Sequence, residues 1–129
     1  MSEKKEPGGL YTAGYHGTSV EHAMQIAQSG YDATEGAVVF LPEWNLRAAI
    51  HQGIRESIGM PEFAIVFARF PATALTEGIE HAELVIPHDL LGEITIVRAM
   101  AWQMRRNAGI PPRPLYDREP YSPPVWWTN

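Results

Sequence analysis

The chain has 129 residues, of which 45% are hydrophobic and 19% charged, so it fits one globular domain rather than a disordered chain. Its net charge of -5 argues against a general nucleic-acid-binding protein, and the absence of cysteine excludes disulfides, thiolate catalysis and thiolate metal sites. No apolar run reaches the ~20 residues of a membrane helix, so we expect no membrane partner. The first residues lack the apolar segment of a signal peptide. We therefore expect a cytoplasmic protein, or one delivered into a target cell without a cleaved signal.

The chain begins with a polar segment, residues 1–9, which predicts a mobile leader. Residues 10–15 then indicate a strand, and residues 20–28 indicate a helix. Ser19 is the residue type that caps a helix N-terminus, and Gly30 is the type that ends one. The pattern therefore predicts a strand, a short polar turn and a helix.

The middle of the chain predicts a second strand and helix, and then a long strand. Residues 37–41 form a compact apolar run typical of a buried strand. Residues 43–58 place apolar side chains on one face of a helix, with Asn45 as a candidate cap. Residues 62–70 alternate as a strand whose two faces are both mostly apolar, so we expect this strand in the centre of a sheet.

The second half predicts shorter elements. Residues 72–75 indicate one helical turn, residues 83–86 a short strand, residues 88–91 a turn and residues 93–98 a further strand. Residues 100–107 favour a final short helix. Helices that come early and strands that crowd the second half are typical of an α+β domain.

The segment after residue 110 is rich in proline and aromatic residues, and residues 98–129 as a whole are mildly basic. It holds six of the 11 prolines, and we expect no regular element in it. Its aromatic residues predict packing on the domain or on a partner. We therefore divide the chain into a leader (1–9), a domain (10–110) and a packed tail (111–129).

The segment Tyr15-His16-Gly17-Thr18-Ser19 carries the strongest functional signal. Glycine allows a ligand or another backbone to come close, and the two hydroxyl groups can donate or accept hydrogen bonds. These polar groups lie where a strand meets a helix, and such junctions hold side chains in fixed positions. The alternative is an ordinary turn with a capping serine and a surface histidine.

Three blocks in this order resemble the ADP-ribosyltransferase superfamily, in its histidine-containing branch with diphtheria toxin and the poly(ADP-ribose) polymerases. The first is Tyr15 to Ser19 with the helix after it. The second is residues 36–41, followed by residues 45–51, and the third is residues 83–87, followed by residues 90–97. The resemblance spans about residues 10–98. It implies an α+β fold of two small, packed, mostly antiparallel β-sheets with flanking helices.

The resemblance also implies a reaction and a set of site residues. NAD would be the substrate, and ADP-ribose would pass to a macromolecular acceptor, protein or nucleic acid, with release of nicotinamide. Glu83 and His16 would be catalytic: Glu83 would stabilise the positive charge on the ribose carbon. His16 would hydrogen-bond the ribose, and the Gly17 backbone would hold the nicotinamide amide. The residues that would line the NAD cleft are Tyr15, His16, Gly17, Thr18, Ser19, Phe40, Trp44, Ile50 and His51.

The sequence departs from the family pattern at two places. Ile50 stands where the family has a tyrosine that stacks on nicotinamide, so His51 or Trp44 would supply the platform, or the pocket is lined differently. His81 stands two residues before Glu83, where family members that modify arginine have Glu or Gln. Glu93 is a rival for the role of Glu83, although its position suggests a charge at a strand edge.

Other functions remain open at this point. The chain could be an inactive binding module of the same superfamily, or a NAD glycohydrolase that transfers to water. Short, free-standing family members are often bacterial toxins or effectors, so an antitoxin or immunity protein is a further expected partner. The five histidines lack the spacing of helical zinc motifs, and we expect no metal site.

Overall fold

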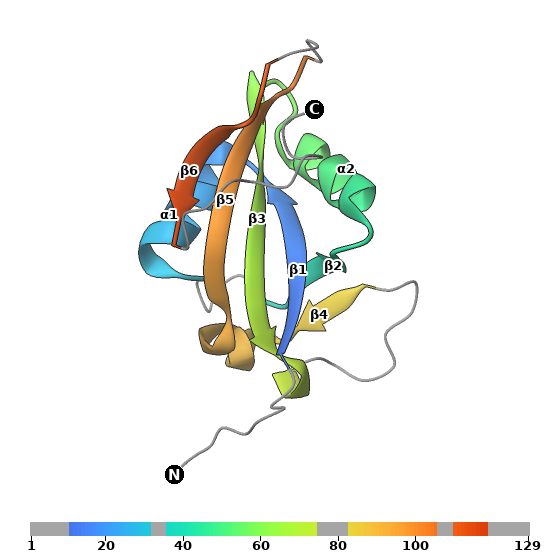
Figure 1. The fold of residues 1–129 in the computed structure, drawn as a ribbon, viewed down its shortest axis with the longest axis vertical. Helices are drawn as coiled ribbons and strands as arrows, with labels where there is room; N and C mark the ends of the chain where they lie inside the picture. Colours follow the sequence, from blue (N-terminus) through green and yellow to red (C-terminus); the bar gives the residue numbers. More distant parts are fainter. Residues whose placement is uncertain (1–10, 32–35, 75–82, 106–109, 119–129) are drawn as a thin grey trace.

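The computed structural model describes residues 11–31, 36–74, 83–105 and 110–118 (Figure 1). The predicted leader and the position of His81 lie outside these residues. The elements in chain order are β1 (Tyr11–Thr18), α1 (Val20–Ser29), β2 (Val38–Pro42), α2 (Leu46–Glu56), β3 (Glu62–Pro71), a 3₁₀ helix (Ala72–Ala74), β4 (Leu84–Ile86), a second 3₁₀ helix (His88–Glu93), β5 (Thr95–Gln103) and β6 (Arg113–Asp117).

The six strands form one sheet in the order β4-β2-β1-β3-β5-β6, and all neighbouring strands are antiparallel. The α+β class is therefore confirmed. The expectation of two packed sheets differs from the structure, because β2 pairs with β1 on one side and with β4 on the other and so joins all the strands edge to edge. The predicted central position of β3 is confirmed, since β3 lies between β1 and β5.

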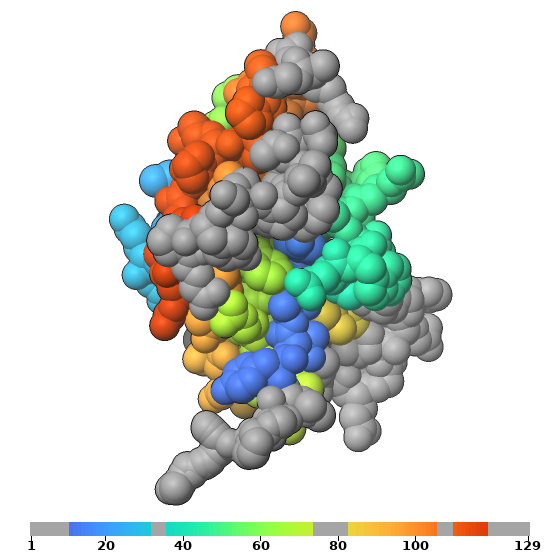
Figure 2. Space-filling view, viewed as in Figure 1, coloured from blue at the N-terminus to red at the C-terminus, as the bar shows by residue number. Residues whose placement is uncertain are grey.

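One helix covers each face of the sheet. In Figure 1, α2 stands beside β1 and β2, whereas α1 lies behind β5 and β6. Alternate side chains of β3 belong to the hydrophobic cores on the two faces of the sheet. Val66 and Phe70 pack on the α1 side, and Phe63 and Ile65 pack on the α2 side. Figure 2 shows the α2 side, where α2 stands next to the surface of β1.

The predicted helix caps are confirmed. The Ser19 hydroxyl accepts a hydrogen bond from the His22 backbone nitrogen at 3.1 Å, and the Asn45 side chain accepts one from the Ala48 nitrogen at 3.3 Å. Gly30 ends α1 with a φ of 78°, a backbone conformation that favours glycine. Both helices therefore start where a side-chain oxygen satisfies an N–H group that has no partner within the helix.

Two predictions in the second half are wrong. The residues predicted as a helix at 100–107 include the end of β5, which pairs with β3 from Thr95 to Gln103. Alanine, methionine and glutamine favour helices, but pairing with a buried strand outweighs that preference. The tail also holds a regular element, β6. It tolerates Pro114 because it is the outermost strand and needs hydrogen bonds on one edge only.

Candidate functional site

A pocket lies where β1 and β2 separate. The two strands pair at Gly14 with Pro42 and at Tyr15 with Leu41, and no further pair joins them. Beyond this point β1 continues along β3, while β2 continues along β4. The gap between them is part of a pocket of about 230 Å³. Of the residues that the structure describes, it is lined by His16, Gly17, Thr18, His22, Ala37, Val38, Val39, Gln52 and Glu56.

The side chain of Gln52 crosses this gap from α2. Its Oε1 accepts a hydrogen bond from the Gly17 backbone nitrogen at 2.8 Å, and its Nε2 donates one to the Val39 carbonyl oxygen at 3.3 Å. One carboxamide thus bonds both strands at the place where they no longer bond each other.

His16 lies on the α1 side of the same pocket and is 9% exposed. Its Nδ1 lies 2.7 Å from the hydroxyl of Tyr31, and its ring packs against the rings of Tyr31 and Phe40, with centroids 5.6 and 5.7 Å away. Burial, together with a smaller electrostatic effect of the neighbouring His22, lowers the pKa of His16 to about 3. His16 is therefore neutral at physiological pH and acts as a hydrogen-bonding group rather than a cation.

A second histidine, His22, lies next to His16 in the pocket lining. The Nδ1 of His22 lies 2.7 Å from the Thr18 hydroxyl, and the His22 ring meets the His16 ring edge-on at 6.1 Å. Because β1 extends to Thr18, His16 and Thr18 belong to a strand and not to the turn that we expected. The sheet therefore fixes the positions of His16 and Thr18, and α1 supplies His22.

Several residues expected in the NAD cleft lie away from this pocket. Tyr15 is buried on the α2 side, where its ring packs on Phe67 at 5.2 Å. Ile50 is half-buried against the α2-side core, His51 is exposed, and Trp44 is 75% exposed. None of these four lines the pocket, and Ser19 is engaged as the cap of α1. Phe40 contributes only through its contact with His16.

The two candidate glutamates also lie outside the pocket lining. Glu83 directly precedes β4 and is exposed, and β2 separates β4 from β1. Glu93 is the last residue of the second 3₁₀ helix and is exposed, so the prediction that it begins a strand is wrong. Among the described acidic residues, the one that lines the pocket is Glu56, at the end of α2.

The sequence does not predict several residues of this site: the side chains of His22, Tyr31, Gln52 and Glu56, and also Ala37, just before β2, and Val38 and Val39 within it. His22 had a usable signal, since it follows Thr18 by four residues across a predicted helix start and could meet its hydroxyl. Tyr31 and Gln52 act through contacts between distant elements, with His16 and Gly17 respectively. No spacing in the sequence predicts such contacts.

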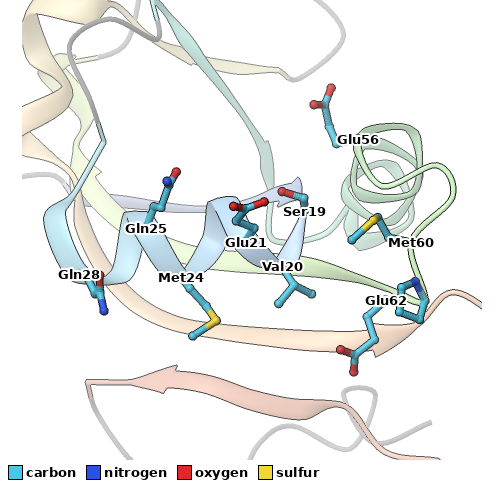
Figure 3. Close-up of a pocket in the computed structure, with 10 residues that line it drawn as sticks. Ser19, Val20, Glu21, Met24, Gln25, Gln28, Glu56, Met60 and Glu62 are labelled. Carbon is cyan, nitrogen blue, oxygen red and sulfur yellow. The ribbon is translucent and has the colours of Figure 1, made fainter.

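A larger hollow adjoins the pocket through Glu56, which lines both (Figure 3). Its volume is about 760 Å³, and it lies between the outer side of α1 and the turn that leads into β3. Met24 and Met60 are among its apolar lining residues, and both are about half exposed. The described residues that line it are Ser19, Val20, Glu21, Met24, Gln25, Gln28, Glu56, Met60, Pro61 and Glu62.

Within the described part of the chain, no three His, Asp or Glu side chains gather as a metal site, and no helix there is long and apolar enough to cross a membrane. Comparison of the chain with protein-family models, curated proteins and solved structures finds no match. The function must therefore be inferred from the pocket and from the motifs that surround it.

Proposed function

We propose that the chain is a NAD-dependent ADP-ribosyltransferase that releases nicotinamide and transfers ADP-ribose to a macromolecular acceptor. One observation carries the proposal. The strands near the start of the three sequence blocks that resemble this superfamily are β1, β2 and β4, which lie next to one another in the sheet although they are far apart in the chain. Residues of the first two blocks, among them His16 and Val39, line one pocket.

The chemistry of these residues fits the proposed reaction. The bond between the ribose carbon and the nicotinamide nitrogen breaks, and nicotinamide leaves with the bonding electron pair. A nucleophile of the acceptor then attacks the ribose carbon and loses its proton. Neutral His16 would hydrogen-bond a ribose hydroxyl. Glu83 does not line the pocket, and its role, to oppose the positive charge that develops on the ribose, comes from the resemblance.

The sizes of the two hollows suggest how NAD would lie. A pocket of about 230 Å³ is smaller than the roughly 300 to 1,000 Å³ of typical small-molecule sites. It would hold the nicotinamide end alone. The adjoining hollow, at about 760 Å³, would take the rest of the molecule, which would pass Glu56.

A second candidate function is a binding module without turnover. It is favoured by the pocket lining, where Ile50, His51 and Trp44 supply no aromatic platform. A NAD glycohydrolase, which transfers ADP-ribose to water, is the enzymatic alternative. A toxin or effector role, with a neutralising partner protein, would be compatible with either enzyme.

The test is incubation of the pure protein with NAD, with nicotinamide release measured for wild type, Glu83→Gln and Glu93→Gln. Both substitutions remove one exposed carboxylate near the start or end of a short element, so Glu93→Gln is the matched control. We expect Glu83→Gln to lose roughly 100-fold or more in rate, as for removal of a preorganised charge-stabilising group.

The outcomes separate the candidates. Release that needs no added acceptor identifies the glycohydrolase. Release that appears only when a cell lysate supplies the acceptor identifies the transferase. NAD binding by calorimetry, with no release even in the presence of the lysate, identifies the binding module. No release and no binding reject the proposal, and full activity of Glu83→Gln rejects the role of that residue.

A further inference from the structure

Gly17 N–H and the Val39 carbonyl form a matched donor and acceptor between β1 and β2. Neighbouring antiparallel strands normally satisfy such groups with each other, but here the strands have already separated. One primary carboxamide satisfies both, and it belongs to Gln52. The pocket therefore contains a binding site for a primary carboxamide that is filled by the protein's own side chain.

We propose that Gln52 is a built-in competitor at this site, and that a ligand carboxamide binds by displacing it. A primary carboxamide from a ligand offers the same oxygen acceptor and the same N–H donor, so it can replace both bonds. Each backbone group has one partner before the exchange and one after it, so no buried group is left unsatisfied in either state, and the ligand must overcome only the bonds of Gln52. The nicotinamide end of NAD is such a ligand, and in this respect the inference rests on the proposed function.

Two features favour displacement of Gln52. Its bond to Val39, at 3.3 Å, is longer than the usual 2.7 to 3.2 Å range for N–H to oxygen bonds and is correspondingly weak. Gln52 is also half-buried and lines the pocket, so its long side chain has space on one side. The backbone of β1 is by contrast fixed by its pairing with β3 from Tyr11 to Thr18.

The test measures binding of nicotinamide, which needs no enzymatic turnover. Calorimetric titration compares wild type with Gln52→Ala, and Arg55→Ala on the exposed side of the same helix is the control. We expect Gln52→Ala to bind nicotinamide at least about tenfold more tightly, because no side chain competes, and Arg55→Ala to match wild type. Nicotinic acid has the same ring but no N–H donor for Val39. We therefore expect Gln52→Ala to bind nicotinic acid no more tightly than wild type does.

A second readout locates the ligand. The amide signal of Gly17 in a ¹⁵N spectrum should shift on addition of nicotinamide to Gln52→Ala. If that variant does not fold, Gln52→Asn keeps the carboxamide on a stem too short to bridge both strands and should show the same gain. Equal nicotinamide affinity of wild type and the folded variant, or an unmoved Gly17 signal, overturns the inference.

The result is separable from the fate of the proposed function. Tight nicotinamide binding by Gln52→Ala, without NAD cleavage by any variant, supports the carboxamide site and argues against the transferase. Cleavage of NAD by wild type, with no gain in Gln52→Ala, supports the transferase and overturns the role of Gln52.

Discussion

Gly17 on β1 and Gly53 on α2 lie in backbone contact. A methyl group on Gly17 would overlap the Gly53 nitrogen and the Ala49 carbonyl oxygen, and one on Gly53 would come within 2.8 Å of the Phe63 ring. The two glycines thus allow the helix to lie directly on the strand. This close approach brings Gln52, the neighbour of Gly53, within reach of the Gly17 nitrogen.

We expect Gly17→Ala to destabilise the fold by about 2 to 3 kcal/mol, because the backbone of α2 must move away to admit the methyl group. Gly92→Ala is the matched control, since a Cβ there meets nothing within 4 Å and its φ is not in the left-handed region. We expect the control to change stability by less than about 0.5 kcal/mol. Urea denaturation of both variants measures the difference, and similar losses for both would contradict the packing role of Gly17.

The buried histidine predicts that stability falls with acid. His16 has a pKa of about 3 in the fold, against 6.5 for an exposed histidine. Below pH 6.5 the unfolded chain therefore binds a proton at His16 that the folded chain does not bind until the pH falls to about 3. The contribution of His16 to stability is consequently highest above pH 6.5. As pH falls from 6.5 toward 3, this one group removes about 1.4 kcal/mol per pH unit.

The control for this effect is His16→Gln, which keeps a hydrogen-bonding group near Tyr31 but does not titrate. Urea denaturation of wild type and variant at pH 7, 6 and 5 isolates the contribution, because the carboxylates titrate equally in both. We expect the difference in unfolding free energy between wild type and His16→Gln to shrink steadily with falling pH. A constant difference would show that His16 takes up its proton without loss of the fold.

Two ion pairs at the β5–β6 end of the sheet should differ in strength. The Arg98 side chain is 3% exposed and its Nε lies 3.2 Å from Asp117, whereas Arg113, bonded to Glu62, is 55% exposed. Removal of a partner from a buried charge costs more than removal from an exposed one. We expect Asp117→Asn to cost about 2 kcal/mol and Glu62→Gln less than about 1 kcal/mol. Thermal unfolding of both variants checks the order, and equal losses would contradict it.

The sequence predicts those parts of the fold that depend on neighbouring residues. Ser19 and Asn45 cap the helices that they were expected to cap, and the apolar residues on both faces of β3 correctly predict its central place. Each of these features depends on residues within one element or at its ends.

The errors arise where distant segments decide the structure. The end of β5 is composed of helix-forming residues, and its pairing with β3 makes it a strand. At the site, the sequence predicts His16, Gly17 and Thr18 as pocket residues, and they line it. It does not predict Gln52, because the bond from α2 to Gly17 depends on the separation of β1 from β2, which no local pattern contains.

The position of Glu56 predicts how NAD affinity depends on charge. This carboxylate lines both hollows, so a NAD molecule that spans them would bring its negative pyrophosphate close to it. Like charges repel, and an exposed pair a few ångströms apart contributes on the order of 1 kcal/mol. We therefore expect Glu56→Gln to lower the KM for NAD about threefold to fivefold, and the gain should shrink at high salt because exposed charges are screened.

Steady-state kinetics at low and high ionic strength, with Glu83→Gln alongside, tests this assignment. We expect Glu83→Gln to lower kcat and kcat/KM together, as for a group that acts mainly in the transition state. The opposite pattern, in which Glu56→Gln loses turnover and Glu83→Gln keeps it, would transfer the catalytic role to Glu56. That result would also fit the structure, since Glu56 and His16 face the same pocket whereas Glu83 lies beyond β2. The two variants therefore decide which carboxylate would oppose the charge on the ribose in the proposed reaction.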